Sequence, residues 1–262
     1  GHSEEVVGQA IRDRSPAPFV FTKCTLVWDA ARTVSHNLEA ASIRREAEAS
    51  LRRLGVDVID LYQMHWPAWK GQPEGVSPGS VEEAVGELTR LREEGKIRHT
   101  GVSNFNADQI ARANAIAPIV SVQPPYSILN RAIEQSLLPY AAKNNIGVLG
   151  YSPMASGLLT GAMTRERIAA LDANDWRHRN RNFQEPKLTA NLALVEVLRA
   201  IGARHERTPG EVAIAWSLHN PAVTAAIVGI RKKDQVDGVI GALEFRLSDA
   251  EYEEIEAAAP VG

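Results

Sequence analysis

Short runs of apolar and β-branched residues alternate along the chain with longer segments of helical periodicity. Within 42–54 and within 81–94, apolar residues recur every three or four positions, which predicts two helices with one buried face each. The runs that predict strands are FVFTK (19–23), VIDLYQMH (58–65), RHTGVSN (98–104), IVSVQ (119–123), GVLGYS (147–152) and TAAIVGI (224–230). Strands that alternate with helices indicate an α/β fold built on a parallel sheet.

Local signals mark where these helices begin and end. Ser80 followed by Glu83 predicts a capping box at the start of the second helix. Gly55 and Gly95 follow the last apolar positions of the two helices, where a left-handed residue ends a helix. The segments 208–211 and 248–251 have the same composition as helix starts.

Composition and charge narrow the class of protein. The 262 residues are 44% hydrophobic and 23% charged, which suits one large globular domain or two small ones, and we expect a single domain over 1–262. A formal net charge of -3 gives no basic surface for nucleic acid, and no apolar run is long enough to predict a membrane span. Cys24 is the single cysteine, which fits a reducing cytoplasm and leaves no cysteine-based metal site. We therefore expect a cytoplasmic protein with a small-molecule ligand.

Polar side chains stand at the carboxyl end of each predicted strand, where barrel enzymes build their active sites. Each has an ordinary explanation when taken alone: a terminal lysine is usually solvated, and asparagines such as Asn104 and Asn106 suit turns and helix caps. The end residues are Lys23, His65, Ser103, Asn104, Gln123, Tyr151, Ser152 and Arg231. Their recurrence at every strand favours a barrel active site. The chain has no GxGxxG motif, so an open dinucleotide-binding sheet is disfavoured.

An ordered set of motifs resembles the aldo-keto reductase superfamily, in its bacterial aldehyde- and sugar-active branch. The matching segments are GHSEEVVG (1–8), FTKC (21–24), DLYQMHWP (60–67), GVSNF (101–105), VQPPYSILNR (122–131), GYSPMASGLLTG (150–161) and IVGIRKKDQV (227–236). They occur in family order and cover nearly the whole chain. The resemblance implies a TIM (β/α)8 barrel, of which this chain supplies six βα units, and NADP(H)-dependent reduction of a carbonyl.

The resemblance also assigns roles to single residues. Lys23 and His65 match two members of the family's catalytic tetrad, in which a tyrosine donates a proton while the nicotinamide delivers hydride. A neighbouring cation lowers a phenol pKa, and an imidazole orients the carbonyl oxygen. The cofactor-binding residues implied are Ser103, Asn104, Gln123, Tyr151, Ser152, Ala155, Gly157, Leu158, Gly229, Arg231 and Gln235. Arg231 matches the position that meets the adenosine 2'-phosphate, which favours NADP(H) over NAD(H).

The other two members of the tetrad, an aspartate and the donor tyrosine, precede the segment that matches Gly1 in the family. We therefore expect both upstream of Gly1, in a longer protein that has two more strands. Six parallel strands cannot close an eight-stranded barrel. On motif grounds no tyrosine within the chain replaces the donor.

The substrate and the activity leave alternatives open. Trp28, Trp66, Trp69 and Trp176 fall in loops after strands, and their flat faces suit a small aldehyde, ketone or sugar. The leading hypothesis is carbonyl reduction. A nicotinamide-binding regulatory subunit with little or no turnover is the alternative, and a Schiff-base lyase that uses Lys23 is a third. Nothing in the sequence fixes the oligomeric state.

Overall fold

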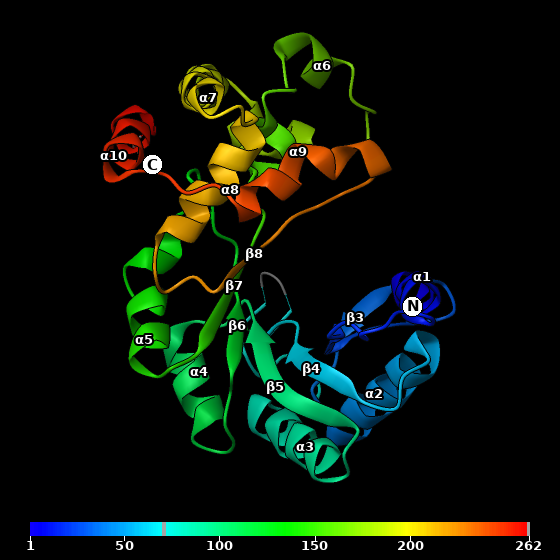
Figure 1. Cartoon of the computed structure of the whole chain (residues 1–262). Helices are drawn as coiled ribbons and strands as arrows, with labels where there is room; N and C mark the ends of the chain where they lie inside the picture. Colours follow the sequence, from blue (N-terminus) through cyan, green and yellow to red (C-terminus); the bar gives the residue numbers. More distant parts are fainter. Residues whose placement is uncertain (70–71, 261–262) are drawn as a thin grey trace. The chain divides into compact units, whose positions relative to one another are not determined.

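The computed structural model describes residues 1–69 and 72–260, and the chain forms two compact units within them. The first unit comprises residues 1–123 and 139–147, and the second comprises 124–138 and the residues from 148 onward. Parallel strands joined by helices run through both units, with the hydrogen-bonded order β1-β4-β5-β6 in the first and β7-β8 in the second. This α/β architecture confirms the fold class expected from the alternating pattern (Figure 1).

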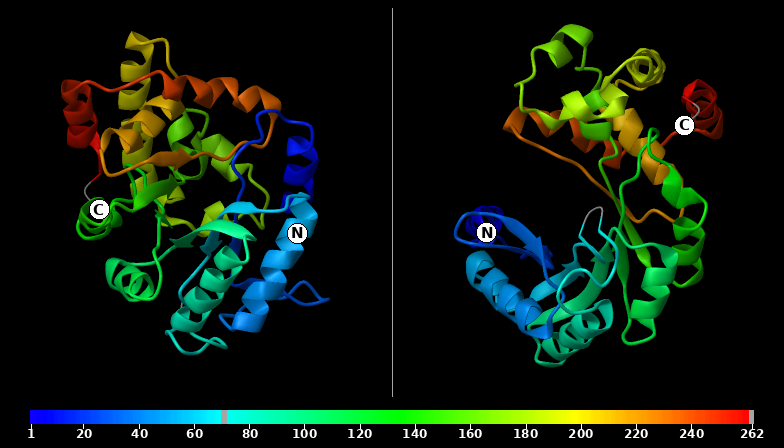
Figure 2. Two further views of the ribbon diagram at one scale, coloured as in Figure 1. Left: turned by 60° about the horizontal axis from the view of Figure 1, so that its bottom comes forward. Right: turned by 180° about the vertical axis from the view of Figure 1, so that it is seen from behind.

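The first unit is a parallel sheet with helices packed along one face. Its elements are α1 (His2–Ile11), β1 (Phe21–Cys24), β2 (Leu26–Trp28), β3 (Val34–His36), α2 (Ala40–Leu54), β4 (Ile59–Met64), α3 (Val81–Glu93), β5 (Ile97–Ser103), α4 (Ala107–Asn114), β6 (Ser121–Gln123) and most of α5 (Leu137–Lys143). Helices α2 and α3 lie side by side and cover one face of β4 and β5 (Figures 1 and 2). The active-site residues expected in this unit therefore have to lie on the opposite face or at the strand ends.

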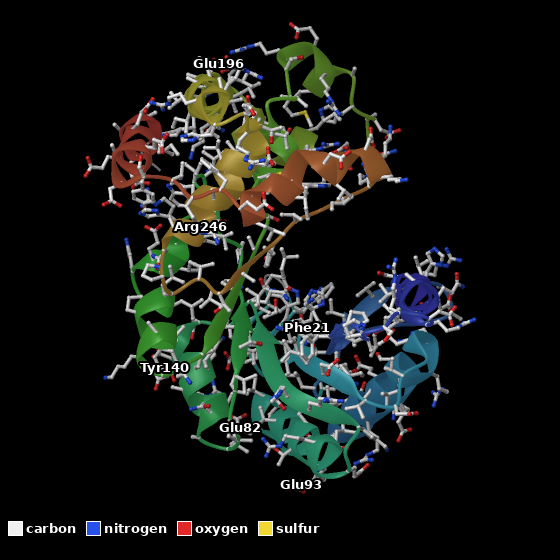
Figure 3. The ribbon with its side chains drawn as sticks, in the orientation of Figure 1. Phe21, Glu82, Glu93, Tyr140, Glu196 and Arg246 are labelled. Carbon is white, nitrogen blue, oxygen red and sulfur yellow. The ribbon has the colours of Figure 1, made fainter. Side chains whose placement is uncertain are left out.

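Alternation along the strands separates these two faces. The hydroxyl of Thr22 donates to Glu4 Oε1 on α1 (2.6 Å), so Thr22 and Cys24 face the helices. Phe21, which is 52% exposed, points the other way (Figure 3). By the same alternation, Lys23 shares the face of Phe21. In β4, Leu61 and Gln63 share the face of Lys23, because Lys23 is the register partner of Gln63. A row of side chains thus crosses the face of the sheet that the helices do not cover. We call it the open face of this unit.

Helix ends follow the expected chemistry, with one difference. Gly55 takes a left-handed φ of 67° and donates its N–H to Leu51 O (2.9 Å), and Gly95 has φ 75°. Ser80 Oγ accepts from Glu83 N (3.1 Å), but the Glu83 carboxylate accepts from Ala40 N (2.8 Å) rather than from Ser80. Half of the predicted capping box is formed, and its glutamate joins α3 to the start of α2 instead.

The second unit is mainly helical. Its elements are η1 (Ala132–Glu134), β7 (Gly147–Tyr151), η2 (Ala155–Thr160), α6 (Arg165–Ala169), η3 (Trp176–Arg179), η4 (Arg181–Phe183), α7 (Lys187–Arg204), α8 (Pro209–His219), β8 (Ala225–Ile227), η5 (Lys233–Gln235), α9 (Asp237–Ile240), η6 (Gly241–Leu243) and α10 (Asp249–Ala258). Helices α7 and α8 pack on each other and on η2. Helices begin after Thr208 and Ser248, as the sequence predicts, and both cap residues form complete capping boxes.

The strands match the predicted runs to within three residues at either end. Near the start of the chain, the structure adds elements that the sequence did not predict. The antiparallel pair β2 and β3 follows β1, and helix α1 opens the chain. Within the described residues, no helix combines the length and the apolar composition needed to cross a membrane.

Candidate active site

Strand β1 places Lys23 on the open face of the first unit, one residue before the strand ends. The side chain is partly buried, and burial lowers the pKa of its ammonium from the ordinary value. In the part of the chain that the structure describes, no carboxylate lies within ion-pair distance of Lys23 Nζ. A partly buried cation without an acidic partner is costly to maintain for stability alone, so it indicates a ligand oxygen.

His65 follows β4 directly, and hydrogen bonds fix its backbone on both sides. Its N–H donates to Cys24 O (3.1 Å), and its carbonyl accepts from Asn104 Nδ2 (3.0 Å). Burial lowers the pKa of the imidazole to about 4, with contributions from the charges of Lys23 and His36. At neutral pH the ring is therefore uncharged and presents one N–H donor and one acceptor nitrogen.

Lys23 and His65 thus stand together at the carboxyl ends of two adjacent strands. Lys23 pairs in register with Gln63, two residues before His65, and its charge acts on the His65 ring. This is the arrangement that the sequence predicts. A cation beside a neutral imidazole suits an oxygen that gains negative charge, because both can direct a hydrogen toward it.

The ends of β4, β5 and β6 are tied together by Ser103 and Asn104. Ser103 Oγ donates to Gln123 O (2.7 Å) and accepts from Asn104 Nδ2 (3.1 Å). Asn104 takes a left-handed φ of 60°, and its N–H donates to Gln123 O (3.1 Å). The structure therefore brings these three predicted residues together beside His65, and two of them hold the framework of the site.

The surroundings of Tyr62 and Tyr126 bear on which residue could donate a proton to the carbonyl oxygen. Tyr62 alternates with Gln63 in β4 and is completely buried on the helix side, where burial raises the pKa of its phenol far above the ordinary value. The hydroxyl of Tyr126, in the second unit, donates to Glu134 Oε1 (2.8 Å). That neither residue supplies the proton stays a prediction.

His36 is a residue near the site that sequence reasoning missed. It is 5% exposed, its Nε2 lies 3.0 Å from Trp66 O, and its Nδ1 lies 2.7 Å from Ser77 Oγ. The ring therefore bridges β3, the residue after His65 and the loop before α3. No pattern in the sequence marks it, since it stands in a short strand that was not predicted.

In the second unit, the loop after β7 has an unusual backbone conformation. Tyr151 ends the strand, and positive φ angles follow at Ser152 (62°) and at three successive residues, Ala155 (46°), Ser156 (60°) and Gly157 (93°). The contact of this loop with a pyrophosphate stays a prediction. Leu158 is completely buried in an apolar cluster with Phe183, so only its backbone can contribute to such a site.

The loop after β8 carries the predicted phosphate contact on an exposed turn. Gly229 and Arg231 are exposed, and Gln235 Oε1 accepts from the N–H groups of Arg231 (2.7 Å) and Lys232 (3.1 Å). Gln235 therefore acts within the turn that presents Arg231. The predicted contact of Gln235 with adenine stays a prediction. Its side-chain oxygen already accepts hydrogen bonds from two backbone N–H groups.

The tryptophans predicted to line the substrate pocket fall into two groups. Trp28 and Trp176 are each 52% exposed, on β2 and η3 respectively. Trp66 and Trp69 are partly buried in the loop after β4. Trp66 lies next to His65, with ring centroids 6.4 Å apart.

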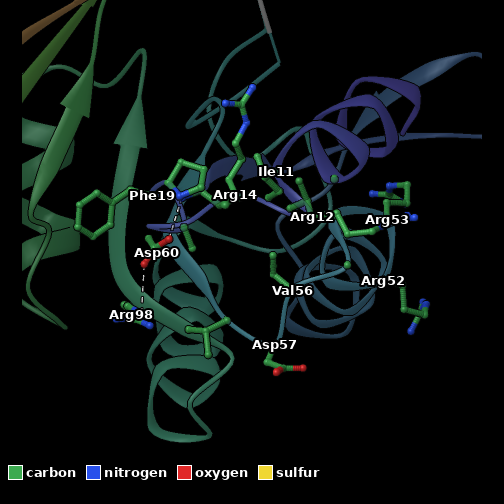
Figure 4. A pocket seen from close by; sticks show the side chains of 17 residues that line it. Ile11, Arg12, Arg14, Phe19, Arg52, Arg53, Val56, Asp57, Asp60 and Arg98 are labelled. Carbon is green, nitrogen blue, oxygen red and sulfur yellow. Dashed lines mark hydrogen bonds and ion pairs between the residues drawn. The ribbon is translucent and has the colours of Figure 1, made fainter.

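An arginine-rich hollow lies at the opposite ends of the same strands (Figure 4). It is lined by Arg12, Arg14 and Arg52 and by residues that precede β1 and β4. Asp60 accepts from Val20 N (2.7 Å) and pairs with Arg98 (3.1 Å). The amino ends of barrel strands serve stability rather than chemistry, so we do not place the active site there.

Comparison with known proteins agrees with this geometry. Residues 1–260 match the Aldo/keto reductase family. The chain belongs to the aldo/keto reductase family. It is 35% identical to the aldo-keto reductase YhdN of Bacillus subtilis (97% of this chain, 75% of the relative) and 36% identical to the NADH-specific methylglyoxal reductase of Escherichia coli (96% and 77%).

Solved structures of aldo-keto reductases share the fold. The glycerol dehydrogenase AKR11B4 from Gluconobacter oxydans matches with a TM-score of 0.89 at 36% identity, over 98% of this chain and 76% of its own. The aldo-keto reductase AKR11C1 from Bacillus halodurans, in its holo form, gives a TM-score of 0.79 at 25% identity, over 98% and 78%. The family consists of oxidoreductases that use nicotinamide cofactors. No cluster of three or more metal-binding side chains occurs among the described residues.

Proposed function

We propose that this aldo/keto reductase is an NADP(H)-dependent enzyme that reduces the carbonyl of small aldehydes, ketones or sugars to an alcohol. One observation carries the proposal. Lys23, a partly buried cation without an acidic partner, stands beside His65, whose pKa of about 4 keeps it neutral at the carboxyl ends of β1 and β4. Such a pair has little structural purpose and suits a carbonyl oxygen.

The two side chains have complementary tasks in this proposal. A bound reduced nicotinamide would supply hydride to the carbonyl carbon, which would leave negative charge on the oxygen, and the donor tyrosine that the family resemblance implies would supply the proton that completes the alcohol. The Lys23 ammonium and the His65 N–H both stabilise that charge, since each donates toward it from a partly buried position. Because His65 is neutral, it donates without adding a second buried cation to the charge of Lys23.

The proposed cofactor contacts follow the two groups of residues described above. Gln123, with Ser103 and Asn104 as its frame, would bind the nicotinamide carboxamide. The backbone of the loop 152–158 would bind the pyrophosphate, and Tyr151 would stack on the nicotinamide ring. Arg231 would bind a 2'-phosphate bidentately, which makes NADP(H) the preferred cofactor. One relative is named as NADH-specific, so the two cofactors have to be compared directly.

The proposed substrates are small and carry a carbonyl next to a polar group. The named relatives act on methylglyoxal and glycerol. Trp66 stands directly after His65 and offers an aromatic face beside the reacting oxygen. We therefore expect three-carbon aldehydes and keto-aldehydes to react best.

The test combines binding with turnover. NADPH fluorescence titration of the full chain should show saturable binding, and methylglyoxal or glyceraldehyde should then cause a loss of absorbance at the NADPH band. Binding without turnover over a panel of aldehydes, ketones and sugars would favour the regulatory-subunit alternative. The absence of any binding would overturn the proposal.

A further inference from the structure

Gln63 is a completely buried amide that the proposed mechanism does not use. It lies in β4 on the same face as Lys23, its register partner in β1, and its relative exposure is 0%. A buried amide needs hydrogen-bond partners, because a buried donor or acceptor that is left unpaired loses its hydrogen bond to water and gains none in return. The partners of Gln63 therefore decide what it does.

Gly101 allows Gln63 to reach across the intervening strand. Gly101 in β5 is the register partner of both Gln63 in β4 and Ser121 in β6. A Cβ atom at position 101 would lie 2.3 Å from Ser121 Oγ and 3.1 Å from Gln63 Cγ. The absence of a side chain at this position thus opens the space in which the side chains of β4 and β6 meet.

A short chain of hydrogen bonds fills this space. Gln63 Nε2 donates to Ser121 Oγ (3.5 Å), and Gln123 Nε2 donates to Gln63 Oε1 (3.2 Å). All three side chains are buried. With its nitrogen held by Gln63, Gln123 makes no hydrogen bond through Oε1 to any residue that the structure describes. The amide oxygen of Gln123 is the atom left for a ligand.

We propose that Gln63 is a positioning residue that orients the side chain of Gln123, so that Gln123 Oε1 accepts a hydrogen bond from the NH2 group of the nicotinamide carboxamide. The inference rests on the proposed function, which assigns Gln123 to that carboxamide. It adds a residue one layer below the strand ends, which acts on the cofactor only through Gln123. Gln63 itself does not touch the cofactor.

A cofactor analogue separates this role from a purely structural one. In reduced 3-acetylpyridine adenine dinucleotide phosphate, an acetyl group replaces the carboxamide, so the carbonyl is kept and the NH2 group is lost. Gln63→Met keeps the length of the side chain and removes both hydrogen bonds. The dissociation constant of NADPH should rise about tenfold in this variant, which corresponds to about 1.4 kcal/mol. That of the analogue should change less than twofold.

Leu61→Met is the matched control, since Leu61 lies on the same strand and face and is 5% exposed. It should leave the affinity for both cofactors within twofold. A double-mutant cycle provides the second measurement. If Gln63 acts through Gln123, Gln63→Met should have no further effect on NADPH affinity in a Gln123→Met background. Thermal unfolding of each variant should show that the proteins are folded at the assay temperature.

The outcomes are distinct. An equal loss of affinity for NADPH and the analogue, an additive double mutant, or no loss at all would each overturn the role of Gln63 while leaving the proposed function in place. Failure of the wild-type chain to bind NADPH or the analogue would overturn the proposed function, and this inference with it. A loss confined to NADPH and to proteins that retain Gln123 is the expected result.

Discussion

His65 lies beside Lys23 at the strand ends, and the pKa of its imidazole is lowered to about 4 because the ring is buried and the Lys23 charge is close. We predict that NMR titration of the His65 ring protons gives a midpoint near 4 instead of the ordinary value near 6.5. Lys23→Met should raise that midpoint, since it removes the cation. A midpoint near 6.5 in the wild-type protein would contradict the buried, cation-facing position of the ring.

The lowered pKa of His65 also determines how the stability of the fold depends on pH. A histidine with a depressed pKa in the fold binds fewer protons than it does in the unfolded chain between pH 6.5 and about 4. The contribution of the neutral His65 ring to the free energy of unfolding is complete above pH 6.5. It is lost as the pH falls from 6.5 to about 4. His65→Asn should therefore flatten part of the acid limb of the free energy of unfolding, measured by urea denaturation between pH 4 and pH 7.

The pKa of Glu46 is shifted in the opposite direction to that of His65. Its carboxylate accepts from Thr25 N (2.8 Å) and Ser42 Oγ (3.0 Å), and burial raises its pKa to about 7. Thr25 has a φ of 81° two residues after Lys23, so Glu46 stabilises a strained turn next to the site. The folded protein holds the proton more tightly than the unfolded chain does, so this contribution is lost as the pH rises from 4.5 through 7.

Glu46→Gln stays neutral and can still accept from Thr25 N. The free energy of unfolding of the variant minus that of the wild type should increase by about 1–3 kcal/mol as the pH rises from 5 to 8. Chemical denaturation at several pH values measures this difference. A constant difference over that range would show that Glu46 is not buried as described.

Gly101 is predicted to be intolerant of a side chain. Gly101→Ala brings its Cβ within 2.3 Å of Ser121 Oγ, which should cost about 1–3 kcal/mol of stability. Adding Ser121→Ala removes the clashing oxygen and should restore part of the loss. Gly86→Ala in α3 is the control, because no atom lies within 4 Å of its added Cβ, and it should stabilise the helix by about 0.5–1 kcal/mol. Equal effects at Gly101 and Gly86 would contradict the packing described for β5.

Arg231 tests the cofactor preference. Arg231→Ala should weaken NADPH binding about tenfold, by loss of a charge-assisted bidentate contact, and should leave NADH binding unchanged. Lys232→Ala, one residue further along the same exposed turn, serves as the control for general charge. If the two variants weaken NADPH equally, or if NADH already binds more tightly than NADPH to the wild type, the NADP(H) assignment is wrong.

The sequence predicts the sheet and the main site residues because both leave local patterns. The Lys23 and His65 positions follow from strands that end on polar residues, and the structure places them together. The partial capping box at Ser80 could not be predicted, because the Glu83 carboxylate finds a tertiary partner in Ala40 N. Secondary-structure patterns carry no information about such long-range competition.

The sequence predicts the position of Gln63 in part and that of His36 not at all. Gln63 stands between Leu61 and His65 at a spacing of two, so the sequence already places it on the face of His65. Its use depends on Gly101 in another strand and only the structure shows it. His36 has no periodic context at all, since its strand has three residues and its partners, Trp66 and Ser77, both come from the connection between β4 and α3.

The pairing of Lys23 with His65 is the central claim, and the kinetics of Lys23→Met test it most directly. For NADPH-dependent reduction of methylglyoxal, kcat/KM should fall about 100-fold to 1,000-fold, the range for loss of one donor to a developing oxyanion. The dissociation constant of NADPH should stay within twofold, which shows that the fold and the cofactor site are intact. A Lys23→Met protein that retains more than a third of the wild-type kcat/KM would contradict the account.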